Sequence, residues 1–266
     1  MAASCFSFIS LYGRYLRRTF TAAGLSQETV DIDAKTTICY WCPRPDSRSM
    51  EKPSLVLIHG FGPNSLFQWK HQAISLGKLL ENLGVNRYSV MGTSYGGMVA
   101  YHMASMWPER VEKVVIASSA VNMIQKDHEE LLERAKVKII DDLMLPKTAA
   151  QLRNLIRMTM FKLPPVLPDF LLNNFHTLFA ENEEEKRELL KGITIGRDNT
   201  VHVFPLQQEV LIVWGEHDQI FPLKKAFELK ELLGEKVQLE VLKNTSHGPQ
   251  VEDPNKFNAV VKEFLC

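Results

Sequence analysis

Three residues of this chain are of the types that together perform nucleophilic catalysis: Ser94, Asp218 and His247. A serine hydroxyl is a weak nucleophile at neutral pH, and it attacks a carbonyl carbon when a histidine takes its proton. A carboxylate that accepts a hydrogen bond from the other ring nitrogen holds the histidine in the required tautomer. The set therefore predicts acyl transfer through a covalent intermediate, which needs neither a metal nor an organic cofactor.

The local sequence around Ser94 favours this chemistry. The pentapeptide Gly92-Thr93-Ser94-Tyr95-Gly96 follows an apolar, strand-like run at residues 88–91, and a helical pattern begins at Met98. In a strand–turn–helix setting, G-x-S-x-G forms a turn so sharp that its serine is strained and its hydroxyl is exposed. The two flanking glycines are expected because a Cβ atom at either position would crowd the turn. The alternative is a glycine-rich turn that contains a serine by chance.

The candidate acid and base also follow predicted strands. Three short runs that are mostly apolar are each followed by a turn. Asp218 ends the turn Gly215-Glu216-His217-Asp218 after residues 210–214, and His247 lies in Asn244-Thr245-Ser246-His247-Gly248 after residues 239–242. The third run, residues 56–58, leads into His59-Gly60-Phe61-Gly62. Parallel strands place such turns at one edge of a sheet, so the order Ser, Asp, His predicts one site there. His217 is an alternative base, but that assignment leaves His247 without a role.

At these residues the chain resembles the serine hydrolases of the α/β-hydrolase superfamily, in particular monoacylglycerol-lipase-like proteins and plant lidded esterases. The similarity runs from about Val30 to the C-terminus. The resemblance implies catalytic Ser94, Asp218 and His247, an oxyanion hole from the backbone N–H groups of Phe61 and Tyr95, and supporting turn residues His59, Gly60, Gly62, Gly92 and Gly96. Epoxide hydrolases and haloalkane dehalogenases share the scaffold but use a carboxylate nucleophile, so Ser94 argues against both activities.

The resemblance also implies the architecture: an α/β fold with a mostly parallel sheet, flanked by helices, and a helical cap inserted after strand 6 of the family. The expected organisation is an N-terminal amphipathic segment over 1–27, a core over 28–120 and 202–266, and a cap over 121–201. Several apolar cap residues suit a greasy substrate group or form the core of the cap itself. They are Phe161, Leu163, Val166, Leu167, Phe170, Leu171 and Phe175.

One interval is too short for the family pattern. Ser94 follows His59 by only 35 residues (94 − 59), whereas the family places two crossovers here and a single βαβ unit takes about 30 residues. The interval therefore predicts one helix, at residues 65–84, and the absence of strand 4 of the sheet. An N-terminal hairpin, predicted at residues 30–32 and 37–41, must then pair with the strand at 54–58 or leave its edge exposed. We hypothesise a shortened form of a complete hydrolase, from alternative splicing or an imperfect gene model.

Composition limits the partners. Lys and Arg number 31, as do Asp and Glu, so no overall charge favours nucleic acid, and no run of about 18 apolar residues predicts a membrane span. Residues 1–20 are amphipathic and lack acids, with Arg14, Arg17 and Arg18 on the polar side. Such a segment is typical of an organelle transit peptide or of a peripheral membrane helix, and a helix packed on the domain is the third interpretation.

The expected location is therefore intracellular, whether cytoplasmic, organellar or membrane-associated, because the N-terminal segment lacks the pattern of a secretion signal. We expect a monomer that acts on a small-molecule ester with an apolar acyl or monoacylglycerol-like group. Two alternatives remain open: a ligand-binding, receptor-like protein that keeps the triad, and a catalytically impaired shortened isoform. Esters, thioesters, amides and C–C bonds all remain candidate targets.

Overall fold

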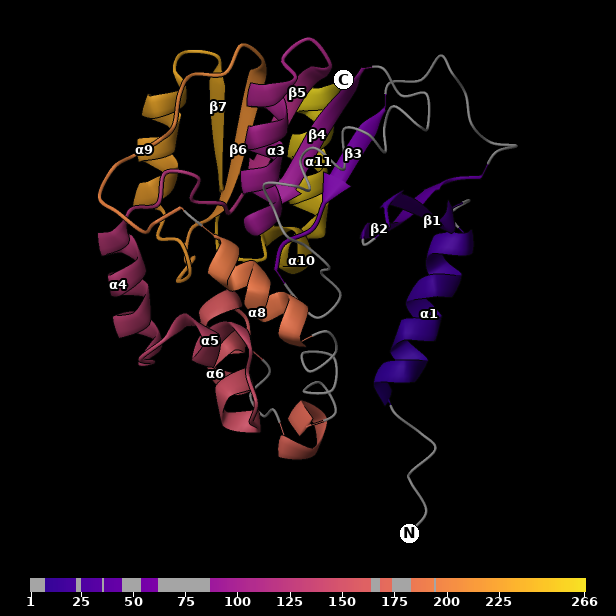
Figure 1. Cartoon of the computed structure of the whole chain (residues 1–266), viewed down its shortest axis with the longest axis vertical. Coiled ribbons are helices and arrows are strands. Elements are labelled where there is room, and N and C mark those ends of the chain that lie inside the picture. The colour runs from indigo at the N-terminus through magenta and orange to yellow at the C-terminus, as the bar shows by residue number, and fades with distance from the viewer. Residues whose placement is uncertain are drawn as a thin grey trace.

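The computed structural model describes residues 8–22, 25–34, 36–44, 54–61, 87–163, 168–173, 183–193 and 195–266. Gly62 and the helix predicted at residues 65–84 lie outside these ranges. The described residues form a parallel sheet flanked by helices, a second group of helices beyond the carboxyl ends of the strands, and a separate N-terminal hairpin preceded by a helix (Figure 1).

Among the described residues, the central sheet has five parallel strands in the order β3-β4-β5-β6-β7. They are β3 (Leu55–Ile58), β4 (Tyr88–Thr93), β5 (Val111–Ala117), β6 (Glu209–Gly215) and β7 (Val237–Leu242). The inner strands are mostly apolar because both faces of a parallel sheet are covered by helices. This arrangement confirms the predicted α/β-hydrolase fold class.

Alternate residues of the inner strands β5 and β6 belong to different cores. On β5, Val114 and Ile116 belong to the core formed with α3 (Tyr95–Met106) and α9 (Lys224–Leu233). Val115 and Ala117 belong to the opposite core, which contains Phe257, Val261 and Phe264 of α11 (Pro254–Leu265). Successive side chains of a strand point to opposite faces of the sheet, so the same strand contributes residues to both cores. The helices therefore hold the strands from both sides and fix the positions of the loops at their ends.

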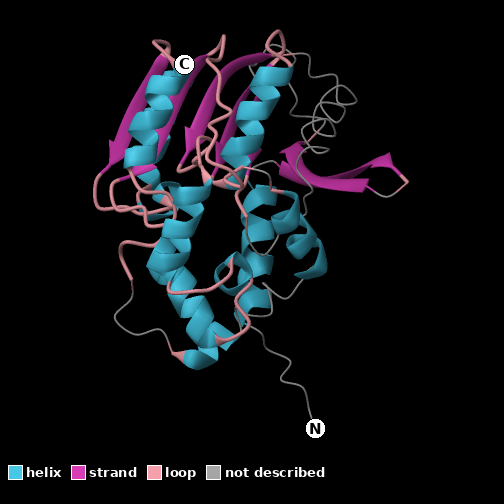
Figure 2. Cartoon of the chain, turned by 60° about the vertical axis from the view of Figure 1, so that its left-hand side comes forward, coloured by secondary structure: helices cyan, strands magenta, loops and turns pink. Residues whose placement is uncertain are grey.

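A helical insertion joins β5 to β6. Its helices include α4 (Gln125–Ala135), α5 (Ile140–Met144), α6 (Ala149–Thr159) and α8 (Glu183–Gly192). They lie beyond the carboxyl ends of the strands (Figure 2). Arg187 of α8 links this group together, with one guanidinium nitrogen 2.7 Å from Asp141 of α5 and another bonded to Glu183 of its own helix. The insertion corresponds in sequence position to the expected cap.

The predicted hairpin forms but does not join the central sheet. Strands β1 (Leu25–Asp33) and β2 (Thr36–Pro43) pair with each other in a separate antiparallel sheet. Within the described ranges β3 pairs with β4 alone, and its Leu55 and Leu57 side chains are 40% and 64% exposed. Of the two outcomes expected from the short interval, pairing of the hairpin with β3 does not occur among the described residues.

The first helix, α1 (Phe8–Ala22), packs against the hairpin. The ring of Phe20 lies 5.2 Å from that of Trp41, and Arg17 donates a hydrogen bond to Gln27. In the portion of the chain that is described, no helix combines the length and apolar character needed to cross a bilayer.

Candidate active site

Ser94 forms the turn between β4 and α3 and has an unusual backbone conformation, with φ 53° and ψ −121°. A positive φ is costly for a residue with a side chain and persists only where the surroundings enforce it. Two backbone hydrogen bonds do so here, from the Ser94 N–H to the carbonyl of Ala117 (2.8 Å) and from the Gly97 N–H to the carbonyl of Ser94 (2.9 Å). The turn therefore presents the serine at the carboxyl end of the sheet.

Close backbone approach explains the glycines around this turn. A Cβ atom on Gly92 would lie 1.9 Å from the carbonyl oxygen of Gly96, and one on Gly96 would lie 2.2 Å from that of Ile58. A Cβ atom on Gly60 would lie 3.0 Å from Cβ of Ser94. The loop after β3 thus contacts the serine turn directly, and only glycine fits at the contact points.

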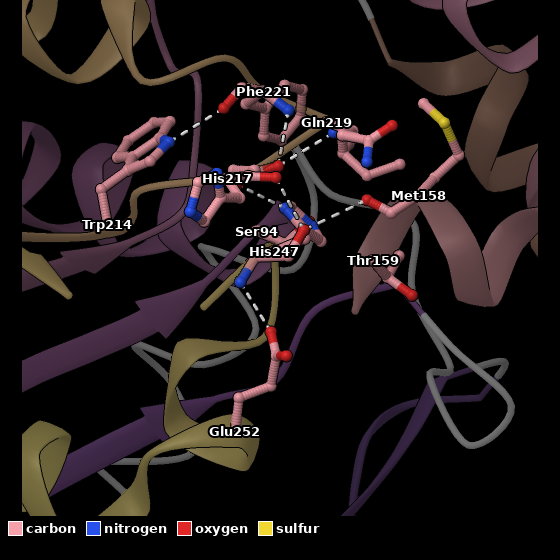
Figure 3. A network of polar contacts seen from close by, with 12 residues as sticks. Ser94, Met158, Thr159, Trp214, His217, Gln219, Phe221, His247 and Glu252 are labelled. Atoms are coloured by element: carbon pink, nitrogen blue, oxygen red, sulfur yellow. Dashed lines mark hydrogen bonds and ion pairs between the residues drawn. The ribbon is translucent and has the colours of Figure 1, made fainter. Parts of the chain in front are cut away.

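The structure brings the three chemically important side chains together. His247 Nε2 lies 2.9 Å from Ser94 Oγ, across 153 residues of sequence (Figure 3). His247 Nδ1 lies 2.9 Å from Oδ2 of Asp218. Because the carboxylate can only accept, Nδ1 carries the proton and Nε2 of the neutral ring accepts from the serine hydroxyl. This is the geometry that a general base needs in order to activate a hydroxyl nucleophile.

The carboxylate of Asp218 is rigidly held. Its side chain is fully buried, and its second oxygen, Oδ1, accepts hydrogen bonds of 2.9 Å from the N–H groups of both Ile220 and Phe221. Trp214, buried at the end of β6, donates from its indole nitrogen to the carbonyl of Phe221 (2.9 Å). The Phe221 ring in turn meets the imidazole of His247 edge-on at 5.5 Å. Sequence reasoning had given neither Trp214 nor Phe221 a role in the site.

The candidate alternative base contacts other groups. His217 lies 3.4 Å from the carboxylate of Glu216, and its ring stacks on Phe161 with the two ring centres 4.3 Å apart. The structure thus places His247, and not His217, on Ser94. His59 bonds within its own turn, with Nδ1 2.8 Å from the carbonyl oxygen of Gly60.

A cavity of about 500 Å³ opens beside Ser94. Phe61 and Tyr95, the two residues expected to supply oxyanion donors, both line it. Burial raises the pKa of the Tyr95 hydroxyl far above its usual value, so this side chain stays neutral. The described residues that line it are Phe61, Ser94, Tyr95, Met98, Met123, Gln125, His128, Leu131, Ile140, Met144, Leu190, Ile193, Ile195, Gly196, Arg197, Ile220 and Phe221.

The described cap residues among the apolar set predicted from the sequence do not line this cavity. Among those described, Phe161 and Phe170 are 41% and 66% exposed, and neither lines the cavity. Val166, Leu167 and Phe175 lie outside the described ranges. The cap supplies its apolar wall through α4, α5 and α8 instead, and the helical pattern alone did not distinguish their inner faces from their outer faces.

Comparisons with known proteins agree with the fold. The profile of the alpha/beta hydrolase fold family matches residues 68–254. A 2-hydroxy-6-oxononadienedioate/2-hydroxy-6-oxononatrienedioate hydrolase from Pseudomonas sp is 26% identical over 192 residues, which cover 71% of this chain and 66% of that protein. Carboxylesterase YbfK of Bacillus subtilis is 26% identical over 194 residues, covering 71% and 60%.

A solved structure, that of a putative lipase from Acinetobacter baumannii AYE, superimposes with a TM-score of 0.76 at 21% identity and covers 99% of this chain and 97% of that one. At this identity the likeness shows the fold alone. The chain spans 66% of the length of the first sequence relative and 60% of the second. Because the family profile covers more than half of the chain, this protein belongs to the alpha/beta hydrolase fold family.

Proposed function

We propose that this protein is a serine hydrolase that cleaves a carboxylic ester with an apolar acyl group through an acyl-enzyme intermediate. The observation that carries the proposal is the continuous hydrogen-bonded series Ser94–His247–Asp218, which ends at a largely apolar cavity. The nucleophile Ser94 contacts the base His247, and His247 contacts the acid Asp218, so these three side chains can activate the serine without any further group.

In the first half of the reaction, His247 Nε2 takes the proton of Ser94 Oγ as that oxygen attacks the ester carbonyl carbon. The imidazolium that forms is stabilised by the buried carboxylate of Asp218. The negative charge on the carbonyl oxygen is met by the N–H groups of Phe61 and Tyr95. Tyr95 is the first residue of α3, and the N-terminus of a helix favours negative charge. Removing one such donor typically costs about 3–4 kcal/mol of transition-state stabilisation.

The first half ends when the bond between the acyl carbon and the alcohol oxygen breaks, His247 gives its proton to the departing alcohol, and the acyl group remains on Ser94. In the second half, a water molecule occupies the place of the alcohol and loses a proton to His247 as it attacks the acyl carbon. The ester bond to the serine breaks, the acid leaves, and the proton returns to Ser94 Oγ. The protein thus ends each cycle unchanged.

The cavity indicates the substrate class. Most of its lining is aliphatic, thioether or aromatic, and such walls bind an apolar group by removing it from water. A second candidate is cleavage of a C–C bond in an acidic keto substrate. Two features favour it: the similarity to a hydrolase of 2-hydroxy-6-oxo dienedioates, and the presence of His128 and Arg197 in the same cavity.

The test is a series of p-nitrophenyl esters from acetate to decanoate. We expect kcat/KM to rise with acyl length until the cavity is full, by about fourfold per buried methylene group, which corresponds to about 0.8 kcal/mol. The same protein would be given 2-hydroxy-6-oxo-6-phenylhexa-2,4-dienoate. Turnover of that compound alone would favour the C–C candidate, whereas well-folded protein without any turnover would favour a ligand-binding role and contradict the proposal.

We also propose that α1 docks on an anionic lipid surface. Its Leu11, Tyr15 and Phe20 side chains are 43–62% exposed. The helix contains three arginines and neither Asp nor Glu. A helix with an apolar side and a basic side lies in the headgroup region of a bilayer, where both sides are satisfied.

The prediction for α1 is that Leu11→Glu lowers cosedimentation with vesicles of phosphatidylcholine and phosphatidylserine by at least about tenfold, and that vesicles of phosphatidylcholine alone bind the wild type weakly. Phe227→Glu, at a position 51% exposed on α9, is the control and should bind as the wild type does. Equal sedimentation of all three proteins would contradict the proposed docking.

A further inference from the structure

Glu252, the last residue of the short helix α10 (Pro249–Glu252), accepts three backbone hydrogen bonds from two separate parts of the chain. Its Oε1 accepts from the N–H of Ser246 at 2.6 Å, and its Oε2 accepts from the N–H groups of Phe161 at 2.8 Å and Lys162 at 3.0 Å. Ser246 directly precedes His247. Phe161 and Lys162 follow Met160, the C-cap residue of α6. We call residues 158–162 the cap junction and residues 243–248 the base loop.

A second set of contacts joins the same two segments. The hydroxyl of Ser246 lies 3.1 Å from the carbonyl oxygen of His217 and 3.4 Å from that of Met158, in the last turn of α6 (Figure 3). Ser246 is almost fully buried. The ring of Phe161 stacks on His217, next to Asp218. The cap junction therefore contacts the loops that carry both the candidate base and the candidate acid.

One carboxylate shared by two segments transmits displacement between them. If the cap junction moves, Glu252 either follows it or loses its hydrogen bonds there, and in the first case it pulls on the N–H of Ser246. The next residue holds its ring nitrogen 2.9 Å from Ser94 Oγ. A misplacement of about 1 Å at a reacting group can cost about 100-fold in rate. Charge-assisted hydrogen bonds such as these are about twice as strong as neutral ones, so the link is stiff.

We propose that Glu252 is a positioning residue that couples the cap to His247, so that the base is aligned only when the cap junction is seated. The proposal rests on the proposed serine hydrolase function. Glu252 does not line the cavity as the structure describes it, and it acts through the base loop without touching the substrate. A carboxylate that only stabilised α10 would have no need to accept two N–H groups from the cap.

The test compares Glu252→Ala, Glu252→Gln and the control Glu263→Ala, which removes an exposed carboxylate from the neighbouring helix α11. Two readouts are used on the full chain: kcat and KM for p-nitrophenyl acetate, whose small acyl group needs little of the cavity, and amide hydrogen exchange of peptides from the cap junction and the base loop. Alanine removes both acceptor oxygens. Glutamine keeps one acceptor oxygen and turns an NH₂ group toward the other donors.

We expect Glu252→Ala to lower kcat by about 100-fold with little change in KM, and Glu252→Gln to fall between it and the wild type. Both peptides should exchange faster together, and Glu263→Ala should match the wild type in every respect. A merely structural carboxylate would lower the melting temperature but leave kcat per folded molecule unchanged, which would overturn the proposal. If Glu252→Ala does not fold, the kcat of Glu252→Gln decides in the same way.

The two proposals fail in different ways. If the wild type neither hydrolyses an ester nor reacts with a fluorophosphonate, the proposed function fails, and hydrogen exchange still tests the coupling. Faster exchange in both peptides of Glu252→Gln supports the link. Faster exchange in the cap junction, with the base loop at its wild-type rate, overturns it.

Discussion

Ser94→Ala is expected to lower kcat for p-nitrophenyl esters by about 10⁵–10⁶-fold, the loss typical when the nucleophile of a serine hydrolase is removed. Alanine lacks the oxygen that lies 2.9 Å from His247 Nε2, so no acyl-enzyme can form. The oxyanion donors and the cavity would remain, and they account for the activity that survives such a substitution. Steady-state kinetics on protein with a cooperative melt provides the measurement.

Ser89→Ala is the matched control for this prediction. Ser89 is a buried serine on the same strand, β4, at the end away from the site. It should keep the kcat of the wild type. A Ser94→Ala protein that retained more than a hundredth of the wild-type kcat would show that another residue is the nucleophile.

The second large effect is expected for Asp218→Asn, which should lower kcat by about 10⁴-fold. The asparagine oxygen can still accept from the N–H groups of Ile220 and Phe221, so the loop keeps its shape. Its NH₂ group then faces Nδ1 of His247 and donates to it, which forces the ring proton onto Nε2. In that tautomer His247 cannot accept the proton of Ser94. The kinetics of ester hydrolysis measure this loss.

Asp253→Asn provides the control for the acid. Asp253 accepts from the N–H of Lys256 at the start of α11, and asparagine caps a helix about as well as aspartate. The control should therefore keep both stability and kcat. An Asp218→Asn protein with nearly the activity of the wild type would mean that another carboxylate orients His247.

The fold could be predicted because its signals are local. Residues 88–91, 111–117 and 210–214 are mostly apolar and end in turn residues, a pattern that favours strands buried on both faces. Parallel strands place their carboxyl ends together, which explains how Ser94 and His247 meet across 153 residues. The last helix could also be predicted, since Asp253 and Pro254 are typical first residues of a helix.

The supporting contacts could not be predicted because they are not local. Glu252 accepts from Phe161, which is 91 residues earlier in the chain, and no sequence periodicity encodes that pairing. A carboxylate five residues after the candidate base was the only available signal. The wall of the cavity was missed for a related reason: amphipathic helices of the cap have apolar residues toward both the cavity and the core, and the choice between them depends on packing.

The short interval between His59 and Ser94 had a consequence that sequence reasoning could state in advance. With room for one helix only, the strand at 54–58 was expected either to gain the hairpin as a neighbour or to keep an open edge. In the described part of the chain β3 has β4 as its neighbour, and Leu57 is largely exposed. The sequence could not decide between the two outcomes because the choice depends on tertiary packing. In the structure β1 and β2 pair with each other and do not pair with β3.

The most direct test of the central claim is to treat the purified chain with a fluorophosphonate and to identify the modified residue by peptide mass mapping. A serine is phosphonylated rapidly only where a base and oxyanion donors are already aligned with it. We predict a single adduct, on Ser94. Protein that is heat-denatured before treatment should form no adduct. A folded protein that gains no adduct, or gains it on another residue, would contradict the assignment of Ser94, His247 and Asp218 as a catalytic unit.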